Sequence, residues 1–259
     1  MKMLGEVPSD IKQSEDQYTT RDGTKMRVKI YQPTEPPSSG SPLIVMYHGG
    51  GFCIGTPEGE EQTCRNMVQA FGAVCVSASY RLAPDHKFPA APNDSWDALK
   101  WVAEHAKALK ADPSQGFLIG GTSAGGNITA VLAHLARDEG LSPPLTGQYL
   151  AIPAVGSGKW IPEKYKDRFL SMEQNQDVPV LPVAAIDMFM KGYQPDEEDN
   201  VNCESAACLW RDRVLTRTQI PLSPIPKAMM VYHLRTSRSM EWTLFGTKVR
   251  SHLFLWSFI

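Results

Sequence analysis

The sequence lacks an excess of charge of either sign. It has 26 Lys and Arg against 28 Asp and Glu, and the formal net charge of its 259 residues is −2. Because electrostatic binding of nucleic acid or anionic membranes needs a concentrated basic surface, this balance argues against both partners. No apolar run reaches the roughly 20 residues that span a bilayer. The first residues, MKMLGEVPSDIKQSEDQ, contain no apolar signal segment. We therefore expect a cytoplasmic protein without a membrane span.

Cysteine is scarce, and its spacing does not suit a metal site. The five cysteines are odd in number and read as reduced thiols: Cys53, Cys64, Cys75, Cys203 and Cys208. The chain also lacks the Lys-Ser/Thr ending of a P-loop and a G-x-G-x-x-G motif that opens a helix. The sequence therefore predicts no metal and no organic cofactor.

Apolar strands alternate with amphipathic helices along the chain. The predicted strands are Lys25–Tyr31, Leu43–Tyr47, Ala73–Ser79, Phe117–Ile119 and Tyr149–Ile152. The predicted helices are Glu58–Phe71, Asn93–Lys107, Ala124–Arg137 and Pro182–Gly192. This order predicts one α/β core over residues 25–220, with a mostly parallel sheet and helices on both faces. The polar residues 1–24 are predicted to be a flexible N-terminal segment.

A G-x-S-x-G motif, Gly121 to Gly125, stands between a predicted strand and a predicted helix. Small residues on both sides of Ser123 let strand and helix crowd together, which would present the hydroxyl on a strained turn. The helix that begins at Ala124 would direct its N–H groups and positive dipole end toward an oxyanion. A chance Gly/Ser turn is the alternative interpretation.

A second motif, HGGGF, ends the predicted strand Leu43–Tyr47. The consecutive glycines Gly49, Gly50 and Gly51 let backbone N–H groups point into a site with no Cβ in the way. Such a loop can supply further oxyanion donors, and a phosphate-binding loop or a flexible turn are the alternatives. His48 precedes the glycines, so we expect it to orient the loop through hydrogen bonds rather than act as a base.

Three motifs in this order resemble the hormone-sensitive-lipase branch of the α/β-hydrolases: HGGGF, YRLAPDHKFPAAPND (Tyr80–Asp94) and GTSAGGN (Gly121–Asn127). The resemblance covers roughly Lys25–Ser205 and is strongest to fungal carboxylesterases, some of which serve secondary-metabolite pathways. It implies an α/β-hydrolase fold with a partial cap around residues 155–192. It also implies hydrolysis of a small carboxylic ester with an acetyl or other short acyl group.

The resemblance implies a role for each matching residue. Ser123 is the nucleophile, and the N–H groups of Gly50, Gly51 and Ala124 form the oxyanion hole. Arg81 and Asp85 are implied to be structural ion-pairing residues. Thr122 stands where the family usually has an acid, which is a departure from the pattern.

The acid and the base of a serine triad have no match, and both stay unassigned. The family places an Asp and then a His after the serine, yet no aspartate follows Asp212. The remaining histidines, His233 and His252, lie in segments unlike the family's. Residues 221–259 form an atypical tail, and the last strands and helices of the fold are expected to be missing or altered.

The genetic code offers a hypothesis for this tail. Met240–Lys248 reads MEWTLFGTK. If the codons for this stretch are read in the frame that starts at the third base of the Met240 codon, they permit Gly-Met/Val-Asp-Pro-Leu-Arg-Asp-Glu. That is the family's segment with the catalytic acid. We therefore expect translation to leave the ancestral frame between about Pro221 and Lys227. The chain would then lack two triad members and keep at most residual catalysis from the oxyanion hole and binding.

Other residues have structural interpretations. We expect His86, His105 and His134 to be surface or satisfied histidines, and Asp94 and Asp97 to act as helix-capping and dipole residues. The run Met188–Met190 suits a cap or core helix and is a candidate wall of an acyl pocket. A non-catalytic binding protein and a thioester or lactone hydrolase are the rival functions. The acyl group, the alcohol and the oligomeric state stay open.

Overall fold

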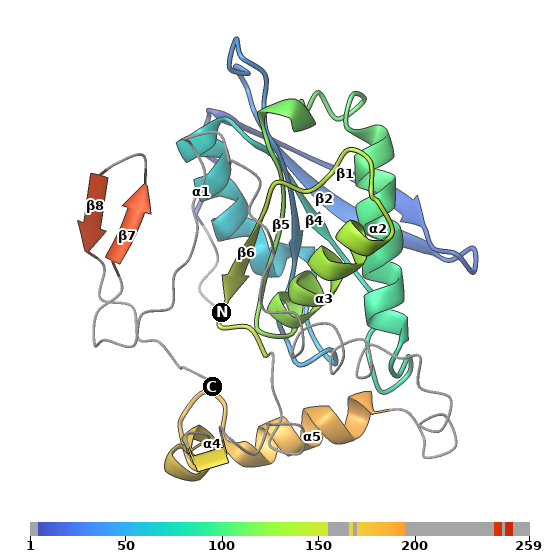
Figure 1. Ribbon diagram of the computed structural model, residues 1–259, viewed down its shortest axis with the longest axis vertical. Helices are drawn as coiled ribbons and strands as arrows, with labels where there is room; N and C mark the ends of the chain where they lie inside the picture. The colour runs from blue at the N-terminus through green and yellow to red at the C-terminus, as the bar shows by residue number, and fades with distance from the viewer. Residues whose placement is uncertain (1–4, 155–165, 168–169, 195–240, 245–246, 251–259) are drawn as a thin grey trace.

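The computed structural model describes residues 5–154, 166–167, 170–194, 241–244 and 247–250, and its centre is a six-stranded sheet (Figure 1). The strands are β1 (Ile11–Thr19), β2 (Lys25–Pro33), β3 (Leu43–Tyr47), β4 (Val74–Ala78), β5 (Phe117–Thr122) and β6 (Gly147–Ala151). Their order is β1-β2-β4-β3-β5-β6. Strands β4, β3, β5 and β6 run parallel, β2 pairs antiparallel with β4, and β1 pairs antiparallel with β2. The predicted mostly parallel sheet is confirmed.

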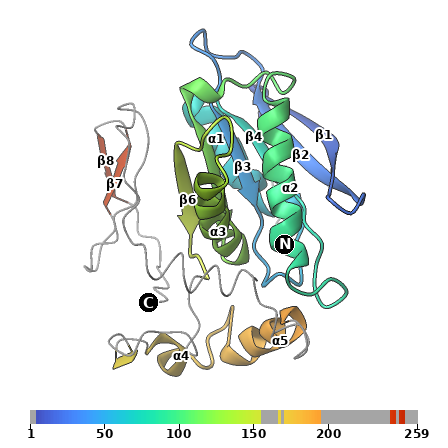
Figure 2. The same cartoon turned by 45° about the vertical axis from the view of Figure 1, so that its right-hand side comes forward.

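Helices cover both faces of this sheet, as predicted (Figure 2). They are α1 (Glu61–Phe71), α2 (Ala90–His105) and α3 (Ala124–Asp138), with short 3-10 helices η1 (Pro57–Glu60) and η2 (Pro113–Gln115). All five residues of β3 are buried. Alternate side chains point to opposite faces of a strand, so Val45 packs with α2 and α3 while Ile44 and Met46 pack with α1. Burial on both faces explains why this strand is a continuous apolar run.

The N-terminal segment corrects one prediction. Residues 1–24 were predicted to be flexible, yet Ile11–Thr19 forms the edge strand β1, paired with β2 along its whole length. Polarity misled the prediction, because only Ile11 and Tyr18 of this strand are buried and the other side chains meet solvent or charged partners. A strand at a sheet edge needs few apolar side chains.

Two further helices and a hairpin complete the described chain. Within the predicted cap segment lie α4 (Ser171–Gln174) and α5 (Val183–Tyr193), beyond the end of the sheet at which β5 leads into α3 (Figure 1). A separate hairpin pairs β7 (Glu241–Leu244) with β8 (Thr247–Arg250). The rest of the predicted tail 221–259 lies outside the described residues. No helix of the described chain has the length and apolarity needed to cross a bilayer.

Candidate active site

Ser123 is the single residue between β5 and α3, and its backbone has a positive φ (φ 54°, ψ −112°). Such a conformation costs on the order of 1–3 kcal/mol in a residue with a Cβ, so other contacts must hold the turn. The Ser123 N–H donates to the carbonyl of Ala151 (2.9 Å), and the Ser123 carbonyl accepts from the N–H of Asn127 (2.9 Å). The half-exposed serine is thus fixed at the positive end of α3.

Gly121 and Gly125 flank the serine because three backbones meet there. A Cβ on Gly121 would lie 2.8 Å from the carbonyl oxygen of Tyr47, and a Cβ on Gly125 would lie 2.6 Å from that of His48. Real Cβ atoms do not approach backbone oxygens so closely. Strands β3 and β5 and helix α3 can therefore touch only with glycine at both positions, which confirms the predicted crowding around the turn.

The glycine loop lies beside this turn. It follows β3, and Gly50 (φ 118°) and Gly51 (φ 59°) have positive φ values that favour glycine. A Cβ on Gly49 would lie 3.0 Å from the carbonyl oxygen of Thr122 and 3.6 Å from the Cβ of Ser123. Within the described chain, the N–H groups of Gly50 and Gly51 meet no acceptor. The structure therefore brings together the two motifs that the sequence singled out.

His48 is buried beneath the loop and fastens it. Its ring stacks on Tyr80 (4.2 Å between centroids), and its Nδ1 donates to the carbonyl of Gly49 (2.8 Å). The Tyr80 hydroxyl in turn donates to the carbonyl of His48 (2.7 Å). Burial lowers the pKa of His48, which keeps the imidazole neutral. These contacts match the role expected from the sequence, in which His48 orients the loop.

Helix α5 packs onto the other side of the loop. A Cβ on Gly51 would lie 2.6 Å from Cδ2 of Phe189, so this ring rests against the glycine. Tyr193 stacks on Phe52 with 3.9 Å between ring centroids. Of the predicted acyl-pocket residues, Phe189 therefore contacts the loop, whereas Met188 is 62% exposed.

The described residues supply no triad base. No hydrogen bond joins the Ser123 hydroxyl to a histidine in the part of the chain that the structure describes. His86 is exposed, and His105 in α2 bonds the carbonyl of Trp101, as expected of structural histidines. His233 and His252 lie outside the described residues, so the base and the acid remain unassigned.

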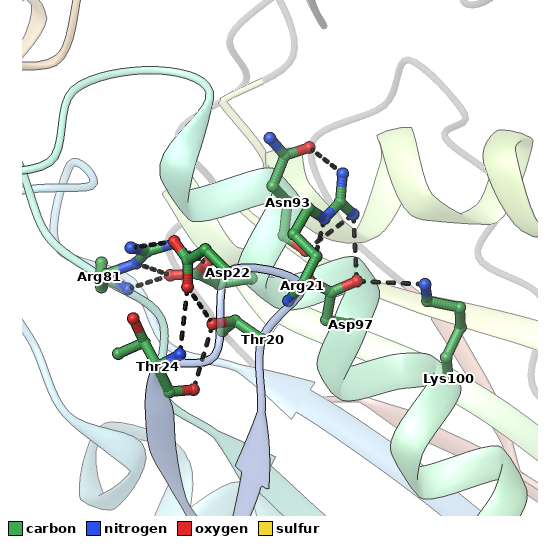
Figure 3. Close-up of polar contacts among 9 residues, drawn as sticks. Thr20, Arg21, Asp22, Thr24, Arg81, Asn93, Asp97 and Lys100 are labelled. Atoms are coloured by element: carbon green, nitrogen blue, oxygen red, sulfur yellow. Dashed lines mark hydrogen bonds and ion pairs between the residues drawn. The ribbon is translucent and has the colours of Figure 1, made fainter.

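Two arginines anchor loops to helix α2, through partners that the sequence did not predict (Figure 3). The Arg81 guanidinium pairs with Asp94 in α2 (2.7 Å) and with Asp22 (2.6 Å). Asp85, the other residue that the resemblance implied to be ion-pairing, is exposed. The expected capping role of Asp94 and Asp97 is wrong, because both carboxylates bind arginines of neighbouring loops.

The second arginine of Figure 3 is Arg21, which binds Asp97 (3.0 Å) and Asn93 (3.1 Å). Lys100 approaches the same Asp97 carboxylate at 3.1 Å. Arg21 was missed because its segment was predicted to be flexible. These contacts tie the β1–β2 turn to α2, on which the loop after β4 also rests.

Glu60 is the buried residue that the sequence argument missed. It ends η1 and is 3% exposed, and its carboxylate accepts hydrogen bonds from the hydroxyls of Thr122 and Thr63. Burial raises its pKa, an effect that these hydrogen bonds only partly offset. The acidic stretch PEGEE looks solvent-exposed by composition, so no signal in the sequence separated Glu60 from its neighbours.

Residues 44–235 of the chain match the family described as the alpha/beta hydrolase fold. An AB hydrolase superfamily protein of Schizosaccharomyces pombe is 38% identical over 189 residues, which are 73% of this chain and 56% of that protein. The carboxylesterase NlhH of Mycobacterium tuberculosis is 41% identical over 173 residues, 66% of this chain and 50% of that enzyme.

Among solved structures, vibralactone cyclase superimposes with a TM-score of 0.68 at 33% identity, covering 74% of this chain and 57% of that chain. The chain thus spans about half the length of the curated relatives that it matches. The matched regions contain both the glycine loop and the nucleophile turn. They support the resemblance that the motifs indicated.

Proposed function

The chain belongs to the α/β-hydrolase fold family, and from this premise we propose that it hydrolyses a small carboxylic ester with an acetyl or other short acyl group. The observation that carries the proposal is the position of Ser123, which stands on a positive-φ turn at the start of α3 beside Gly49. A carboxylesterase among the relatives favours ester chemistry.

In the proposed reaction, the Ser123 oxygen attacks the ester carbonyl while a general base takes the hydroxyl proton. The N–H groups of Gly50, Gly51 and Ala124 would stabilise the oxyanion of the tetrahedral intermediate. Its collapse expels the alcohol and leaves an acyl-serine, which water hydrolyses to release the acid. No hydrogen bond joins a described histidine to the Ser123 hydroxyl, so the base is left unassigned. The chemistry needs no metal and no cofactor.

The two rival functions expected from the sequence, a thioester or lactone hydrolase and a non-catalytic binding protein, stay alternatives. The carboxylesterase among the relatives favours ester hydrolysis over both. A role in secondary metabolism and a cytoplasmic location stay predictions from the sequence.

Turnover of p-nitrophenyl acetate by the full chain, with Ser123→Ala as the control, tests the proposal. We expect hydrolysis that disappears in the variant, together with a covalent fluorophosphonate adduct on Ser123 by mass spectrometry. Serine-independent turnover would contradict the proposed nucleophile. Saturable ester binding with no turnover and no adduct would favour the binding protein.

A further inference from the structure

Glu60 is a buried carboxyl that the proposed ester chemistry does not use. It lies where η1 meets α1, and its carboxylate accepts hydrogen bonds from Thr122 and Thr63. It forms no ion pair with any described Lys, Arg or His. A buried carboxylate without a cation is costly in free energy, so its retention at this place calls for a reason beyond stability.

The contacts of Glu60 and η1 reach both halves of the candidate site. Thr122 directly precedes Ser123, and its carbonyl oxygen faces Gly49 of the glycine loop. Within η1, a Cβ on Gly59 would lie 3.4 Å from the Cβ of His48, the residue that fastens the loop. Glu60 is therefore connected to the nucleophile turn and lies next to the base of the glycine loop.

A hydrogen bond also anchors η1 to strand β4. The carbonyl of Pro57 accepts a hydrogen bond from the Ser77 hydroxyl of β4 at 2.8 Å. Both residues are buried. Of the two hydrogen-bond partners of Glu60, Thr122 is the one in the nucleophile turn.

The groups that face Glu60 do not ionise near neutral pH. Thr122 and Thr63 present hydroxyls, and the remaining titratable neighbours are the Tyr80 hydroxyl and the Cys64 thiol. Burial and the charge of Glu60 raise the pKa of both Tyr80 and Cys64. Burial raises the pKa of Glu60 itself above its ordinary value. Glu60 is thus the member of this cluster that changes charge.

We propose that Glu60 is a positioning residue for Ser123, and that gain or loss of its proton changes the alignment of the serine hydroxyl with the glycine loop through Thr122. The ionised carboxylate accepts hydrogen bonds from both threonine hydroxyls. The protonated carboxyl carries one O–H donor, so one hydroxyl must turn and accept. The ionised form also places a negative charge against Thr122, the residue before Ser123, and a like charge disfavours an oxyanion that forms at the nucleophile.

The structural part of this inference is tested without turnover, and only its effect on rate rests on the proposed function. Carboxyl-labelled glutamate and backbone-labelled threonine and serine in the full chain allow an NMR pH titration. We expect the Glu60 carboxyl to titrate above 4.5, the ordinary value. The Thr122 and Ser123 amides should shift with the same midpoint. Amides that do not follow the Glu60 midpoint in the wild-type chain would overturn the proposal.

Glu60→Gln and Glu61→Gln form a matched pair for assignment and kinetics. Glu60→Gln should remove the shared transition from both amides, whereas Glu61→Gln should retain it. On p-nitrophenyl acetate, wild-type kcat should fall roughly two- to tenfold as Glu60 ionises, with KM unchanged, and Glu60→Gln should abolish that step. A step that persists in Glu60→Gln would overturn the catalytic link. Absence of turnover in every variant would overturn the proposed function alone, because the amide titration decides the positioning role.

Discussion

At the scale of single residues, the neighbouring carboxyls Glu60 and Glu61 differ because their partners differ. Burial raises the pKa of Glu60, and hydroxyls alone counteract it. Burial also acts on Glu61, but hydrogen bonds and charges, chiefly from Lys29 and also from Arg65, lower its pKa below 4.5. Two adjacent acids of one turn therefore have opposite linkage to pH.

This opposition predicts the pH dependence of stability. A raised pKa stabilises the folded state below 4.5, and the contribution is lost as pH rises through the folded pKa. A lowered pKa stabilises above 4.5, and the contribution is lost as pH falls. In urea unfolding, the stability of Glu60→Gln should therefore rise relative to that of wild type as pH increases above 4.5. The stability of Glu61→Gln should fall relative to that of wild type as pH increases toward neutral. Parallel changes in the two variants would contradict the assignment.

The turn glycines give a second prediction at this scale. A Cβ on Gly125 collides with the carbonyl oxygens of Tyr47 and His48, whereas a Cβ on Gly147 in β6 meets only Leu118 at 3.5 Å, an ordinary contact. Gly125→Ala should lower the free energy of unfolding by about 3 kcal/mol or more, because backbone cannot yield as a side chain can. Gly147→Ala should change it by less than about 1 kcal/mol. Equal denaturant midpoints for Gly125→Ala and Gly147→Ala would contradict this prediction, because they would show that the backbones of β3, β5 and α3 can move apart.

At the scale of elements, α5 covers the glycine loop through one side chain. Phe189 rests on Gly51, and the Cys53 thiol bonds the Phe189 carbonyl at 3.6 Å. If the proposed function holds, Phe189→Ala should enlarge the acyl side of the site. We expect kcat/KM for p-nitrophenyl hexanoate to rise relative to acetate by roughly tenfold, the discrimination associated with a few methylene groups.

Met188→Ala is the matched control for that helix, because the Met188 side chain is 62% exposed on the same turn of α5. Its acetate-to-hexanoate ratio should stay within about twofold of wild type, as surface substitutions usually do. A Phe189→Ala ratio no different from that of Met188→Ala would show that Phe189 supports the loop without lining the acyl site.

The elements also show what sequence could and could not predict. β3 was predicted to its exact bounds, because burial on both faces leaves an unmistakable apolar run. β1 was missed because a strand with two buried residues in nine looks like a loop. The nucleophile turn and glycine loop were predicted because glycine has few substitutes where backbones touch. Glu60 was not predicted, since only the folded chain shows that this acid of the run points inward.

At the scale of the whole molecule, the described sheet is unevenly covered. Every residue of β3 is buried, whereas every residue of β6 is only half-buried, and β6 pairs with β5 alone in the described part of the chain. An edge strand of this kind leaves backbone N–H and C=O groups unpaired. The chain also spans about half the length of the curated relatives that it matches.

The reading-frame hypothesis gives the last prediction. It predicts that the printed sequence leaves the ancestral reading frame between about Pro221 and Lys227. The ancestral frame, continued past this point, encodes Gly-Met/Val-Asp-Pro-Leu-Arg-Asp-Glu. Sequencing of the cDNA tests it, and a transcript without the shift would restore the family's segment. Because removal of triad members costs on the order of 10³–10⁶ in rate, a chain with the restored tail should hydrolyse p-nitrophenyl acetate at least about a hundredfold faster than the printed sequence. Ser123→Ala in the restored chain should abolish the gain, since the new residues act through that serine. A cDNA that continues in the printed frame, together with equal Ser123-dependent rates for the two chains, would contradict the hypothesis and place the base among the residues of the printed sequence.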